Sequence, residues 1–219
     1  MASFRRSGIP EVQELKRDAS FQQILELDFN DMIPFVISNI SKPGLYSRLY
    51  MAVNAITLAG LVIGVVWAFS QGWLTWTGLI KQFITGVFAG SILVIPFHEL
   101  FHGLAYRILG ARKIKFGADL QQFIFFVSAD RFPVAGMELY FLALLPFALI
   151  NALTIGVIII WMPHIIIFCG FFLLSHNLMC IGDFAIVNYT RNEKGEIFSY
   201  DEIEKKKSYF YKKVDGNLM

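Results

Sequence analysis

The feature that most constrains this chain is the length of its uncharged stretches. No Asp, Glu, Lys or Arg occurs between Leu139 and Gly182, and none occurs between Met51 and Ser70. A helix of about twenty apolar residues crosses the roughly 30 Å hydrocarbon core of a bilayer. The first stretch is therefore long enough for two membrane spans and the second for one.

The composition supports a membrane protein. Of the 219 residues, 56% are hydrophobic and 16% are charged, whereas about a quarter of the residues are charged in soluble domains. A further span is expected at about 79–109, and a turn at 161–163 separates the last two spans. Between Lys113 and Pro133, short β-branched and aromatic runs punctuated by turn residues predict a hairpin. The expected fold is an all-α polytopic membrane protein with about four transmembrane helices and a small β-hairpin-like element between helices 2 and 3.

We expect three segments in the chain: an N-terminal cytoplasmic or interfacial segment at 1–48, a four-helix membrane domain at 49–190, and a polar cytoplasmic tail at 191–219. The apolar residues between Val12 and Leu27 are spaced for an amphipathic helix on the membrane surface. The tail is expected to be solvated or to lie on that surface. Lys and Arg are concentrated in both ends and in the middle connection. The positive-inside rule therefore predicts a multi-pass protein of the cell membrane with both termini in the cytoplasm.

Charge and cysteine content narrow the functional classes. The net charge is only +2, and the basic residues form no continuous stripe, so no nucleic-acid partner is expected. Cys169 and Cys180 lie in apolar sequence and match no paired-cysteine motif. We interpret both as small buried hydrophobic residues.

One run within the second span carries a recognisable chemical pattern. His98, Glu99 and His102 form a His-Glu-x-x-His motif, which on a helix places two imidazoles on one face at the spacing that a single zinc ion needs. The glutamate lies beside the metal and can take a proton from a water molecule there. The alternative is a pair of histidines that only form hydrogen bonds within the bundle. Ionisable residues inside apolar spans usually mark function, which favours the metal site.

A hydrolytic zinc site uses three protein ligands and one open position, so a third ligand is needed. At 1.5 Å per helical residue, His98 and His102 lie about 10 to 16 Å from the cytoplasmic end of their span, and Asp183 lies about 9 Å from that end of the fourth span. This similar depth favours Asp183, whose carboxylate needs a partner inside an apolar segment.

Other polar residues of the last spans remain open alternatives. His176 is a second candidate ligand, although its greater depth favours a hydrogen bond between helices. Glu138 is a competing ligand, or an acid that contacts a metal ligand without binding the metal itself. Asn177 could donate to a substrate or join two helices, and His164 is expected at the opposite membrane face.

The motif helix, the β-like segment after it and the later aspartate together resemble the site-2 protease class of intramembrane zinc metalloproteases. The chain is most similar to a family of small bacterial membrane proteins described as putative zincin peptidases, over about residues 50–190. The resemblance implies zinc held by His98, His102 and Asp183, with Glu99 activating water. It also implies a β-element that holds substrate extended. The chain departs from the class in having its glycine before Asp183 rather than after it.

The expected function is that of a membrane-embedded zinc metallopeptidase acting on membrane-protein or membrane-proximal peptide bonds near the cytoplasmic leaflet. The expected partners are the lipid bilayer and a peptide or membrane-protein substrate. The alternative is a non-hydrolytic membrane protein that uses the same His/Asp cluster as a metal sensor, transporter or scaffold. The two functions differ in whether Glu99 is needed.

Overall fold

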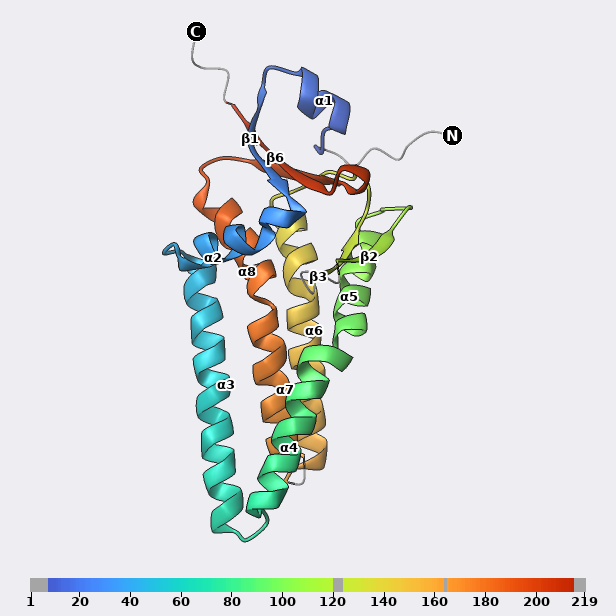
Figure 1. Ribbon diagram of the computed structural model, residues 1–219. Helices are drawn as coiled ribbons and strands as arrows, with labels where there is room; N and C mark the ends of the chain where they lie inside the picture. Colours follow the sequence, from blue (N-terminus) through green and yellow to red (C-terminus); the bar gives the residue numbers. More distant parts are fainter. Residues whose placement is uncertain (1–7, 120–123, 164, 215–219) are drawn as a thin grey trace.

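The computed structural model describes residues 8–119, 124–163 and 165–214. Figure 1 shows a bundle of long helices that carries a small sheet at one end. The helices of the bundle are α3 (Leu45–Ser70), α4 (Trp76–Phe88), α5 (Ile95–Ile108), α6 (Met137–Trp161), α7 (Ile166–Met179) and α8 (Ile181–Asn192).

Several of these helices can cross a membrane. The stretches 45–70, 76–108 and 137–161 are each long and apolar enough, and α7 and α8 make a fourth span if this pair, bent by 44°, is counted as one. Ile56, Ile63 and Ile159 expose 71%, 68% and 74% of their surface. Such exposure suits contact with lipid rather than water. The predicted helical polytopic membrane fold is confirmed, including the turn near residue 162.

The second span is not one regular helix. Between α4 and α5 lies a π-helical turn, η2 (Ala89–Leu93). Pro96 falls in the first turn of α5, where its missing N–H removes no helical hydrogen bond. The irregular turn thus lies just before Pro96. Turns of this kind are frequent at functional sites.

Glycines allow α4 and η2 to pack closely against α7. A Cβ on Gly86 would lie 2.8 Å from the carbonyl oxygen of Phe168, and one on Gly90 would lie 2.2 Å from that of Phe172. Both distances are shorter than real Cβ contacts. Small residues permit such close approach of membrane helices, and here they bring α7 against α4 and η2, which directly precede the helix that carries the motif.

A four-stranded antiparallel sheet covers one end of the bundle (Figure 1). Its order is β1–β6–β5–β4, formed by β1 (Phe21–Asp28), β6 (Lys207–Lys213), β5 (Ile197–Glu202) and β4 (Val134–Ala135). In its register, Leu27 pairs with Ser208 and Tyr200 pairs with Tyr209. The sheet thus joins strands from the first and last parts of the described chain to β4, which lies in the connection between α5 and α6. Short helical segments adjoin it: α1 (Val12–Arg17), η1 (Phe29–Asp31), α2 (Met32–Ser41) and η3 (Ile203–Lys205).

The two polar ends differ from the sequence predictions. The amphipathic helix predicted from Val12 to Leu27 is wrong, because only α1 is helical and β1 follows it. The solvated tail is also wrong, since β5 and β6 are largely buried. Leu15, Phe198 and Tyr200 belong to one buried cluster. Pairing between distant strands has therefore overridden the local helical spacing.

The hairpin between the second and third spans is confirmed. It consists of β2 (Lys115–Asp119) and β3 (Ile124–Ser128), paired antiparallel. Ser128 at the end of β3 donates a hydrogen bond of 2.6 Å to Asp201, which also accepts one of 2.6 Å from Ser208. These bonds connect the hairpin to the four-stranded sheet.

Candidate metal centre

The motif occupies the first half of α5. Because α5 begins at Ile95, His98 and His102 are both fully helical and lie one turn apart on one face. Their Nε2 atoms are 3.1 Å from one another. The two imidazoles therefore converge on a single point, as the spacing predicts.

Asp183 reaches the same point from a different helix. It lies in the first turn of α8, just after the bend at Cys180 that separates α8 from α7. The amino end of a helix carries partial positive charge and favours a carboxylate there. Asp183 Oδ2 is 3.3 Å from His98 Nε2, and Asp183 Oδ1 is 3.4 Å from His102 Nε2. The structure thus brings Asp183, which similar depth in the membrane favoured as the third ligand, to the two histidines of the motif.

The donor geometry fits a zinc ion. With ligands at about 2.0–2.1 Å, two donors of a tetrahedral site are about 3.3 Å apart, close to the three separations found here. His102 Nδ1 lies 2.9 Å from the carbonyl oxygen of Leu142 on α6. An N–H at Nδ1 donating to this carbonyl leaves the Nε2 lone pair free, which is the arrangement usual for metal-bound histidine. His98, His102 and Asp183 could therefore hold the ion.

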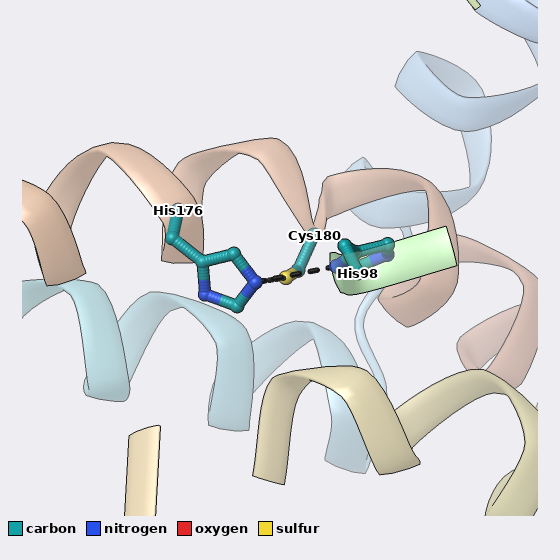
Figure 2. A group of neighbouring side chains, drawn as sticks. All are labelled: His98, His176 and Cys180. Carbon is teal, nitrogen blue, oxygen red and sulfur yellow. Dashed lines mark hydrogen bonds between the residues drawn. The ribbon is translucent and has the colours of Figure 1, made fainter. Parts of the chain in front are cut away.

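His176 and Cys180 form a second group on the other side of His98 (Figure 2). His176 Nε2 lies 3.2 Å from His98 Nδ1 and 3.6 Å from Cys180 Sγ. Both side chains are fully buried. Cys180 was interpreted from the sequence only as a small hydrophobic residue. Its position four residues after His176, one helical turn on, is the signal that could have indicated the contact.

The remaining candidates lie elsewhere. Glu138 lies in the first turn of α6 and is in neither group of converging donors within the described residues. Asn177 is fully buried and joins helices, accepting a hydrogen bond of 2.8 Å from Asn151 and donating one of 3.3 Å to Thr57. Its alternative role toward a substrate is not supported. Cys169 is buried and free, as predicted, and His164 lies outside the described residues.

A cavity of about 490 Å³ adjoins the cluster, and Glu99 is part of its wall together with His98, His102 and Asp183. The side chains of these two histidines and of the aspartate are 14%, 12% and 16% exposed. They are therefore sheltered but reachable from the cavity. Sequence reasoning missed most of the other wall residues, which come from α2, β3, α6, β5 and β6: Met32, Val36, Phe126, Leu142, Tyr200 and Phe210.

Residues 91–198 match the model of a protein family described as "Putative zincin peptidase". The match confirms the resemblance to that family. It runs from η2 to the start of β5 and includes the whole donor cluster with Glu99. No curated protein and no solved structure matches the chain. The family description implies a zinc metallopeptidase, in agreement with the donor set.

Proposed function

We propose that this chain is a membrane-embedded zinc metallopeptidase that cleaves peptide bonds of membrane proteins, or of segments close to the membrane, near the cytoplasmic leaflet. The observation that carries the proposal is the convergence of His98, His102 and Asp183 beside a cavity whose wall includes Glu99. A sensor, transporter or scaffold would need the metal donors, but it would not need a carboxylate next to them in the cavity.

Each residue of the proposed site has a separate role. His98 and His102 offer Nε2 lone pairs and Asp183 offers its carboxylate, so that the three would hold the ion. A zinc ion held there supplies Lewis acidity, which polarises a carbonyl and acidifies a water molecule. Glu99 takes the proton of the attacking water and delivers it to the leaving amine. The proposal thus assigns three ligands and one base to the site.

The surroundings of the cluster suit an extended peptide. A helical substrate hides its carbonyls in its own hydrogen bonds and must unwind before cleavage. β3 supplies Phe125, Phe126 and Val127 to the wall of the cavity, and a strand edge there could pair with an unwound segment. β1 and β6, the first and last strands of the described residues, both lie in the sheet at one end of the bundle. The positive-inside rule assigns that end to the cytoplasm.

The test compares the native protein with Glu99→Gln in cells that produce each one. New peptide N termini in the membrane fraction, identified by mass spectrometry, should appear with the native protein and be absent with Glu99→Gln. Both proteins should retain about one zinc per chain when purified. Equal sets of N termini from the two cultures would refute peptidase activity and favour the non-hydrolytic function.

A further inference from the structure

His176 makes a polar contact to the outer ring nitrogen of His98, one of the proposed metal ligands. Its Nε2 lies 3.2 Å from His98 Nδ1, whereas His98 Nε2 faces Asp183 at 3.3 Å. The imidazole of His98 therefore lies between the donor cluster and His176, with one ring nitrogen directed at each. Figure 2 shows His176 on α7, directed at His98.

The position of one proton follows from this arrangement. A neutral imidazole that binds a metal through Nε2 must carry its hydrogen on Nδ1. Nδ1 of His98 then donates to Nε2 of His176, which must be the unprotonated nitrogen of that ring. His102 has the equivalent contact, from its own Nδ1 to the carbonyl oxygen of Leu142. Nδ1 of each motif histidine thus faces one hydrogen-bond acceptor.

We propose that His176 is a positioning residue for the metal centre: it holds His98 in the tautomer and orientation that present Nε2 to zinc. The inference rests on the proposed function, because it assumes that the cluster binds the ion. Outer partners of this kind typically raise metal affinity by about 10- to 100-fold.

The packing around His176 fixes the acceptor in place. The ring is fully buried and is nearly parallel to that of Phe172, with 12° between the planes and 6.5 Å between the centroids. Phe172 is also the residue whose backbone touches Gly90 of η2. The histidine therefore belongs to the tight contact between α7 and the motif-bearing span.

The alternative is that His176 and Cys180 bind a second ion together with His98. His98 would then bind one ion through each of its ring nitrogens, which requires both nitrogens to lose their hydrogens. The contact with Cys180 Sγ, at 3.6 Å, is explained more simply by packing of the thiol against the ring, since Cys180 lies one helical turn after His176. We therefore assign one metal ion to the cluster and an orienting role to His176.

The experiment measures zinc stoichiometry and affinity in detergent, by competition with a chromophoric chelator. His176→Leu has nearly the volume of histidine but offers no acceptor, and it should weaken zinc binding by about 10- to 100-fold. His176→Gln places an amide oxygen near the position of Nε2 and should restore most of the affinity. His176→Asn is too short to reach and should behave like the Leu variant. Cys180→Ala should bind one zinc with nearly native affinity.

The outcomes separate this inference from the proposed function. Equal affinities of the native protein and a folded His176→Leu or His176→Asn variant would overturn the positioning role alone. Two zinc ions per chain, one of them lost in Cys180→Ala, would overturn it in favour of a second site. A native protein that binds no added zinc would refute the proposed function and this inference together. Thermal unfolding of the metal-free variants shows which of them are folded.

Discussion

Replacing Gly90 by alanine tests how the packing of the bundle supports the metal centre. The added Cβ would lie 2.2 Å from the carbonyl oxygen of Phe172 and 2.9 Å from its Cα, whereas ordinary contacts begin at 3.4 Å. Both neighbouring atoms belong to the backbone, so no side-chain rotation can relieve the clash. α7 must move away from η2 by about 1 Å, and overpacking of this kind costs about 1–3 kcal/mol.

The displacement should also reach the metal centre. Phe172 lies one helical turn before His176, whose hydrogen bond to His98 is 3.2 Å long. A shift of about 1 Å would lengthen that contact beyond hydrogen-bonding range. We therefore expect Gly90→Ala to lower both the stability and the zinc affinity, the latter toward that of His176→Leu.

The matched control is Gly60→Ala in α3, where a Cβ would meet nothing within 4 Å. This variant should be as stable as the native protein or gain up to about 1 kcal/mol from helix propensity. Thermal unfolding in detergent and chelator competition for zinc measure the two effects. If Gly90→Ala unfolds at the native temperature and binds zinc normally, the assigned contact between α7 and η2 is refuted.

Three further predictions follow. The side chain of Glu202 is 1% exposed, and its carboxylate oxygens lie 2.6 Å from the ammonium groups of Lys16 and Lys205. Burial raises the pKa of Glu202, but the two ammonium groups outweigh burial and lower the pKa to about 2. The stability that the Glu202 carboxylate contributes is therefore present above its unfolded pKa of 4.5 and is lost as the pH falls toward 2. The difference in unfolding free energy between the native protein and Glu202→Gln should therefore disappear over that range. A difference that stays constant with pH would contradict this. Asn188→Ala should destabilise the protein by about 1–3 kcal/mol in chemical unfolding, because Asn188 donates to the carbonyls of Asn39 and Lys42; unchanged stability would disprove this contribution. Removing zinc with a chelator should lower the unfolding temperature of the native protein, since a ligand bound only to the folded state stabilises it, but not that of a variant without His102.

Local patterns were enough to predict the membrane part of this chain. The uncharged runs identified the spans, and the β-branched segment after Lys113 identified the hairpin. The His-Glu-x-x-His spacing placed two imidazoles on one face, and the depth of Asp183 brought it to the same layer. Each of these inferences depends on periodicity or length, which single segments carry by themselves.

The parts that could not be predicted depend on contacts between distant segments. The sheet pairs β1 with β6, from opposite ends of the chain, and no local signal in the apolar residues from Val12 to Leu27 distinguishes this strand from an amphipathic helix. The sequence predicted a hydrogen bond of His176 between helices, which is found, but it did not predict His98 as the partner. A straight fourth span places His176 too deep, whereas the span bends by 44° at Cys180, and the two side chains cover the remaining distance.

The most direct test of the metal centre is the zinc content of the purified protein, measured by elemental analysis after preparation without chelators and with added zinc. We predict about one zinc per chain in the native protein and in Glu138→Gln, a carboxylate control outside the converging donors. Asp183→Asn and His98→Ala should lose the ion. A native protein without zinc, or an Asp183→Asn variant that retains it while Glu138→Gln does not, would contradict the assignment of His98, His102 and Asp183 as the ligands.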